Sequence, residues 1–372
     1  MAMPSAGPPR WVRQSEDILP LKSLRDKKPA WRTARPRCPT TLDRGRRAIP
    51  SLIRYQKRSN RKVRLVALAQ AHGDDGWYVR DLGAGQGCQL WRITLGTATR
   101  MGVTNAEGGP GSYYAAEPGE TIWACLRRQT PWLDGMEDPG PFRRTVRCPG
   151  AYHRRIARPI LSMDPQTLWL PNAAGEQRYV TGAQNQLGSL IDDLRSICRV
   201  VQPAPGTLSV HGHEIRNLLI LAATEVEMHW RGILVANGRT AKFNTNEYVK
   251  LADVLGLPAF TVRFHPCPDI DPFTPFALWE AADPTNSLPW FSAYHGVKHN
   301  REFEFERASL ANAFAAIAAC AVLLVAQFGH QALTPELKRF LDVEAPEWPV
   351  EEMYIMPQTD EGWTAQPHPA LI

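Results

Sequence analysis

Disulfide and metal-binding frameworks are the first features that this sequence lacks. Its 372 residues include only seven cysteines, and no two of them form a CxxC pair. An odd, scattered set argues against a disulfide framework and is typical of a reducing compartment, so we expect a cytoplasmic protein. No HExxH motif is present, and we expect neither a metal nor a cofactor. The cysteines are Cys38, Cys88, Cys125, Cys148, Cys198, Cys267 and Cys320.

Long apolar runs are scarce as well. Residues 1–13 are Pro-rich and lack the apolar segment of a secretory signal. One uncharged run, residues 308–329, is long enough to be weighed as a membrane span. It is rich in alanine and carries Ser309, Asn312 and Gln327, which favours a buried core helix. We therefore expect no membrane partner.

Clear periodicity is missing from residues 1–162. This part holds 29 basic and 13 acidic residues, a net charge of +16, whereas residues 163–372 hold 14 and 24, a net charge of −10. The composition predicts a basic, Pro-, Gly- and Arg-rich region that is largely disordered, or a non-native extension upstream of a start near Met163. Its charge together with Trp11 and Trp31 suits loose contact with RNA.

One glycine-rich motif lies in that basic region. Residues 81–87, DLGAGQG, resemble the first motif of S-adenosylmethionine-dependent methyltransferases, in which a loop after a strand approaches the ligand closely. That fold requires alternating strands and helices, and no such series follows residue 87. The pattern therefore favours a protein without this cofactor.

Helical periodicity begins near residue 182. Apolar residues recur at spacings of three and four in residues 182–203 and 211–238, and residues 244–255 form a third helical pattern. Residues 258–289 interrupt the series with a strand pattern and a Pro-rich loop. The pattern predicts a mainly α fold, a helical bundle over residues 163–345 with a small strand and loop insertion, followed by an acidic tail over residues 346–372.

The richest set of reactive side chains directly precedes the uncharged run. Tyr294, His295, Lys298, His299 and Arg301 fall within eight residues, and the two histidines stand four apart, on one helix face. Imidazole titrates near neutrality, so a histidine beside cations suits acid–base chemistry on a phosphodiester. On the predicted helix within residues 211–238, Arg216 is a candidate for one further cation. Two histidines at this spacing also suit a metal ion, but Lys298 and Arg301 would repel it.

Residues 163–329 resemble the HEPN superfamily, named for higher eukaryotes and prokaryotes nucleotide-binding. The signature of that superfamily is Arg-Asn followed a few residues later by His on one helix. The matching segment here is residues 294–299, where His299 occupies the final position, Tyr294 replaces Arg and His295 replaces Asn. The resemblance implies a helical domain that cleaves RNA without a metal, commonly as a dimer and often in defence or toxin systems.

The expected function is therefore an RNA-directed, HEPN-like protein, with endoribonuclease activity as one form of it. In this hypothesis His299 is the acid–base group, Lys298 and Arg301 stabilise phosphate charge, and His295 or Tyr294 orients the substrate. A homodimer through the helical domain is expected. The alternative is a non-catalytic helical module that assembles with partners and carries a degenerate site.

Overall fold

The computed structural model describes residues 75–82, 87–101, 111–130, 133, 136–161, 173–240, 243–357 and 362–372. The basic tail with Trp11 and Trp31, the centre of the glycine-rich motif and the segment after Met163 lie outside these described residues.

A five-stranded antiparallel sheet forms within residues 76–144, in the spatial order β4-β3-β2-β1-β5. Its strands are rich in aromatic and β-branched residues, which fit a pleated surface with one buried face. Trp91 is buried and contacts Phe142 edge to face, with ring centroids 5.5 Å apart. The strands are β1 (Gly76–Asp81), β2 (Cys88–Ile93), β3 (Thr97–Arg100), β4 (Tyr113–Ala115) and β5 (Phe142–Arg144).

Helix α2 (Ile122–Gln129) completes the core of this sheet. The Thr121 hydroxyl accepts a hydrogen bond from the Ala124 amide at 3.2 Å and so caps the first turn. Trp123 on the helix contacts Tyr78 of β1 at a centroid separation of 5.4 Å. A helix packed on several strands supplies the apolar burial that a short sheet requires to be stable.

The prediction of a mainly α fold is wrong. About 47% of the described residues are helical and about 16% lie in strands, so the fold is mixed α/β. The sheet forms inside the segment that composition predicted to be poorly structured. Its strands are only three to six residues long, too short to show clear periodicity in a sequence rich in Gly and Pro.

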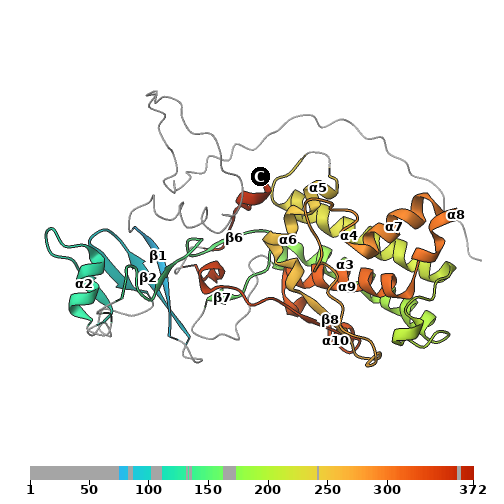
Figure 1. Ribbon diagram of the computed structural model, residues 1–372. Coiled ribbons are helices and arrows are strands. Elements are labelled where there is room, and N and C mark those ends of the chain that lie inside the picture. Colours follow the sequence, from blue (N-terminus) through green and yellow to red (C-terminus); the bar gives the residue numbers. More distant parts are fainter. Residues whose placement is uncertain are drawn as a thin grey trace, which may run out of the picture. The chain divides into compact units, whose positions relative to one another are not determined.

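Four long helices build the second and larger core. Helix α9 is buried along almost its whole length and lies among the other three, α3, α4 and α7 (Figure 1). It is the one helix in the described part of the chain that is long and apolar enough to span a membrane, and 83% of its apolar window is buried inside the protein. The predicted core helix is therefore confirmed. The bounds are α3 (Ala173–Cys198), α4 (His213–Ala236), α7 (Pro289–His299) and α9 (Leu310–Phe328).

The segment between α4 and α7 packs against this helical core. The helix predicted over residues 244–255 forms as two short helices, α5 and α6. The strand predicted near residue 262 is β8, which pairs antiparallel with β9. Trp279 stacks on Trp230 of α4 at a centroid distance of 4.7 Å. The elements here and after α7 are α5 (Thr245–Tyr248), α6 (Lys250–Leu255), β8 (Thr261–Phe264), α8 (Arg301–Glu304), α10 (Pro335–Lys338) and β9 (Leu341–Glu344).

The acidic tail folds back on the residues that follow the sheet. Strand β10 (Tyr354–Ile355) pairs with β7 (Ile160–Leu161), and β11 (Thr364–Ala365) pairs with β6 (Ala151–Tyr152), both in parallel. Tyr354 is fully buried, and its hydroxyl donates a hydrogen bond to the Ile156 carbonyl at 2.6 Å.

Candidate functional site

Helix α7 presents the predicted cluster at its C-terminal end. Pro289 occupies the first turn, where its missing amide costs nothing. Trp290, Phe291 and Val297 are buried and hold the helix against the core. The last turn, with Lys298 and His299, is exposed. The local sequence thus fixes one side of the helix and leaves Lys298 and His299 facing solvent.

A hydrogen-bonded chain connects α7 to α4. The Lys298 ammonium donates to the Tyr294 hydroxyl at 2.6 Å, and this hydroxyl donates to Oε2 of Glu227 at 3.1 Å. The hydrogen bond from Tyr294 raises the pKa of Lys298, so its cation is maintained. Tyr294 is fully buried. Direct contact between Tyr294 and a substrate stays a prediction, and in the structure its hydroxyl accepts the hydrogen bond that positions Lys298.

The two histidines of α7 have different surroundings. Their rings are nearly parallel, with centroids 6.0 Å apart. His295 is half-buried against Phe291, and its buried Nε2 has no hydrogen-bond partner among the described residues. Burial lowers the pKa of His295, which favours the neutral ring. His299 is exposed. Of the two, His299 is the ring that a ligand in solvent reaches directly.

Arg216 lies at the end of α7, although it belongs to the first turns of α4. Its Nε and Nη2 both donate to the Val297 carbonyl at 3.4 Å. A cation at a helix C-terminus offsets the partial negative charge of the free carbonyl groups. The end of α7 can therefore receive an anion that bare carbonyl groups would repel.

Arg301 begins helix α8 and is exposed. Gly296 allows the following segment to approach α7, because a Cβ there would lie only 3.1 Å from both Arg307 Nη1 and Glu304 Oε2. Arg307 then donates to the Ser292 hydroxyl at 2.7 Å. Within the described residues, no hydrogen bond or ion pair connects Arg301 to the other five predicted side chains. The structure thus gathers Arg216, Tyr294, His295, Lys298 and His299, and Arg301 lies beside them.

Sequence reasoning missed a second polar cluster, which is buried between α3, α4 and α9. The ring of His229 lies within hydrogen-bond distance of two donors at Nδ1, the Tyr179 hydroxyl at 2.9 Å and the Gln327 amide at 2.8 Å. Its Nε2 is 3.6 Å from Glu225. Burial lowers the pKa of His229 to about 3, so the ring is neutral. The only sequence signal was a histidine inside the apolar stripe of α4.

Arg155 closes this buried cluster on the side of α3. Its guanidinium lies over the Tyr179 ring at 3.7 Å and pairs with Glu176 at 2.9 Å. The backbone of Arg155 has φ of 55°, a left-handed conformation that a non-glycine residue seldom adopts. The guanidinium also lies against Gly232, where a side chain would displace it. These contacts hold three helices and the preceding loop in one arrangement.

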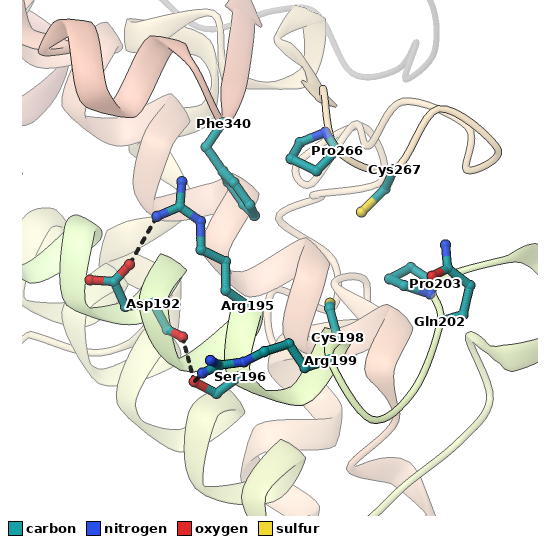
Figure 2. A pocket seen from close by; sticks show the side chains of 10 residues that line it. All are labelled: Asp192, Arg195, Ser196, Cys198, Arg199, Gln202, Pro203, Pro266, Cys267 and Phe340. Carbon is teal, nitrogen blue, oxygen red and sulfur yellow. Dashed lines mark hydrogen bonds and ion pairs between the residues drawn. The ribbon is translucent and has the colours of Figure 1, made fainter.

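A surface pocket of about 580 Å³ lies at the end of α3, and none of its lining residues belongs to the α7 cluster (Figure 2). Arg195 pairs with Asp192 at 3.0 Å and lies over the Phe340 ring, while Arg199 donates to Ser196 at 2.8 Å. Cys198 and Cys267 also line it. Burial raises the pKa of both thiols, that of Cys198 to about 11, so neither is a reactive thiolate at neutral pH. Among the described residues, no group of three or more His, Cys, Asp or Glu side chains is placed to hold a metal ion.

Comparison with family models, curated proteins and solved structures finds no match for this chain. The resemblance of residues 163–329 to the HEPN superfamily thus stays a prediction, and its functional reading depends on the residues described above.

Proposed function

We propose that the protein is an RNA-directed, HEPN-like domain whose α7 cluster cleaves a phosphodiester without a metal. The observation that supports this most is the exposed His299 beside Lys298, a cation held in place by Tyr294. Arg216 adds positive charge at the same helix end. An acid–base group next to fixed cations is the minimum that RNA cleavage requires.

In the proposed reaction His299 removes the proton from a ribose 2′-hydroxyl. The 2′-oxygen attacks the adjacent phosphorus, the bond to the 5′-oxygen breaks, and the leaving oxygen takes up a proton from the protonated His299. The products are a 2′,3′-cyclic phosphate and a 5′-hydroxyl. Lys298 and Arg301 stabilise the negative charge that develops on the phosphoryl oxygens. His295 packs beside His299 and fixes its position.

Purified full-length protein incubated with a single-stranded RNA tests this function. Cleavage is expected to persist in EDTA, to stop when the 2′-hydroxyl at the cut position is replaced by hydrogen, and to fall by about 100-fold or more in His299→Ala. His265→Ala is the matched control, since His265 is an exposed histidine outside the cluster. Equal cleavage by wild type and His299→Ala, or no cleavage at all, would exclude the ribonuclease proposal. We also propose a cytoplasmic location, which fits the free cysteines of the described part of the chain.

A second candidate function is self-assembly through α4. Its solvent face carries Leu221, Met228 and Val235, which are 48%, 56% and 52% exposed and stand seven residues apart. Heptad spacing of apolar residues is the pattern by which helices pair. In an antiparallel pair of copies centred on Met228, Leu221 of one copy meets Val235 of the other, so the exposed apolar positions cover one another across a twofold axis.

The mass of the particle in solution tests this assembly. Light scattering after size exclusion is expected to give a dimer for wild type and a monomer for Met228→Glu, because the twofold places two of the new carboxylates against each other. Thr224→Glu, on the same face between the apolar positions, is expected to weaken the dimer less. A monomeric wild type, or a dimer unchanged by Met228→Glu, excludes the α4 interface.

A further inference from the structure

A cavity of about 270 Å³ lies where the C-terminal end of α9 meets the returning tail. Most of its wall is carbon, and the polar side chains on it are those of Arg158, His330 and Gln331. The two α9 carbonyl groups nearest the cavity are already satisfied: Ala326 accepts from the Ala157 amide and Val325 from the Gly329 amide. The apolar part of the wall includes Leu255, Phe260, Val325, Ala326, Pro346 and Trp348.

Arg158 places a buried positive charge at this cavity. The guanidinium stacks on the Trp348 ring at 3.4 Å and donates to the Ala157 and Val254 carbonyls at 2.9 and 2.6 Å. Its buried Nε has no hydrogen-bond partner among the described residues, because Oε2 of Glu352 lies 3.7 Å away. Burial lowers the pKa of Arg158 to about 10, so the group is still charged at neutral pH.

The surroundings of Arg158 leave this positive charge poorly balanced. Arg147 is also buried, lies over the Tyr354 ring and donates to the Glu352 carbonyl, and its Nε likewise lacks a partner within the described residues. Burial lowers the pKa values of His153 and His368, and the positive charges of the two nearby arginines lower these histidine pKa values further. Among the described residues, the one carboxylate paired with Arg158 is that of Glu352, whose side chain is partly exposed. A buried cation with incomplete pairing is costly, and an anion at the cavity would reduce this cost.

We propose that this cavity is a binding site for a small organic carboxylic acid. The carboxylate meets Arg158, and a flat apolar body lies against Phe260, Val325 and Trp348. Inorganic phosphate fits less well because a dianion requires several donors, whereas most of this wall is carbon. The ring of His330, half-buried at the same wall, offers one further hydrogen-bonding group. The proposal is independent of the α7 cluster.

Calorimetric titration of the full-length protein with benzoate, benzamide and inorganic phosphate tests the site. Benzoate is expected to bind, and benzamide, which has the same shape without the charge, is expected to bind about tenfold or more weakly. Phosphate is expected to bind more weakly than benzoate. No benzoate binding, equal binding of benzamide, or tighter binding of phosphate would overturn the proposal.

Three variants test whether benzoate binds in this cavity. Arg158→Met is expected to lose benzoate binding, but it also removes two hydrogen bonds that hold the fold. Ala326→Leu keeps Arg158 and fills the cavity, so it should weaken benzoate binding by about tenfold or more while the circular dichroism spectrum is unchanged. Glu352→Gln removes the competing carboxylate and should tighten benzoate binding. Unchanged affinity in Ala326→Leu, or weaker affinity in Glu352→Gln, would contradict the assignment.

Discussion

Two polar clusters flank helix α4, and they differ in access to solvent. On one side Glu227 accepts a hydrogen bond from Tyr294, and the chain ends at the exposed Lys298. On the other side Glu225 lies near His229, and the histidine and its amide neighbour Gln327 are almost fully buried. The two glutamates are two residues apart, and the rotation of the helix sends them to opposite sides.

This difference in solvent access indicates that the α7 cluster suits ligand binding and catalysis, whereas the His229 cluster suits stabilisation of the fold. At the α7 cluster a buried tyrosine holds a cation that remains in solvent, so a ligand meets a group that is already in position. At the His229 cluster the groups contact one another in the core, and a buried polar network of this kind favours a single packing arrangement. Substitutions should therefore affect stability on the His229 side and activity on the α7 side.

The largest expected effect on stability is that of His229→Leu. The change leaves the Tyr179 hydroxyl and the Gln327 amide without their shared acceptor in the core. We expect the free energy of unfolding to fall by about 2–4 kcal/mol at neutral pH. Urea denaturation followed by circular dichroism measures it. A loss as small as that of a surface substitution would mean that the network does not hold the helices together.

The pH dependence of the same variant sharpens this comparison. The folded-state pKa of His229, about 3, lies below the ordinary histidine value, so only the unfolded chain binds the proton as pH falls from about 6.5. This contribution to stability is complete above about pH 6.5 and is lost as pH falls from there toward 3. The loss is about 1.4 kcal/mol per pH unit, and it is absent in His229→Leu. The stability difference between the two proteins should therefore shrink between pH 6.5 and 5, and a constant difference would contradict a neutral buried ring.

On the α7 side, Tyr294→Phe should act more on activity than on stability. The ring still fills its buried position, and the lost hydroxyl costs about 1 kcal/mol of unfolding free energy. Lys298 loses the acceptor that positions it, so RNA cleavage, if present as proposed, should fall by about tenfold with folding intact. Urea denaturation and the cleavage rate are measured on the same sample. An unchanged rate would show that Tyr294 is only a packing residue.

The sequence predicted the helical core better than the sheet. In α3 and α4 apolar residues recur at spacings of three and four, so the burial of residues such as Leu194 and Ile233 follows from spacing alone. Helix α9 is apolar on all sides, and its length and lack of charge predicted its burial. In the sheet, β4 contributes only three residues and β3, its partner, only four, too few for a pattern. Pairing of such short strands depends on contacts far apart in the sequence, such as that between Trp91 and Phe142.

The candidate site was predictable in part, as the fold was. The density of titratable groups between Tyr294 and Arg301 pointed to α7, and the helical repeat put His295 and His299 on one face. The sequence did not show which of these side chains are buried, because the burial of Tyr294 and the exposure of Lys298 depend on how α7 packs against α4 and α9. The His229 cluster was missed because a histidine in an apolar stripe shows neither its partners nor its burial.

The smallest expected effect is that of Gln327→Leu, in the buried cluster that His229→Leu should disrupt strongly. A neutral ring whose Nδ1 is the acceptor has one lone pair there, and the Tyr179 hydroxyl and the Gln327 amide compete for it. Gln327 Oε1 is buried and has no partner among the described residues, so this side chain is already incompletely satisfied. Leucine of similar size removes that cost, and Tyr179 keeps the histidine. We expect a change in unfolding free energy of less than about 1 kcal/mol in either direction, again by urea denaturation. A loss as large as that of His229→Leu would show that the amide, rather than the phenol, is the donor that holds His229, and the role of Tyr179 would then be limited to its stacking with Arg155.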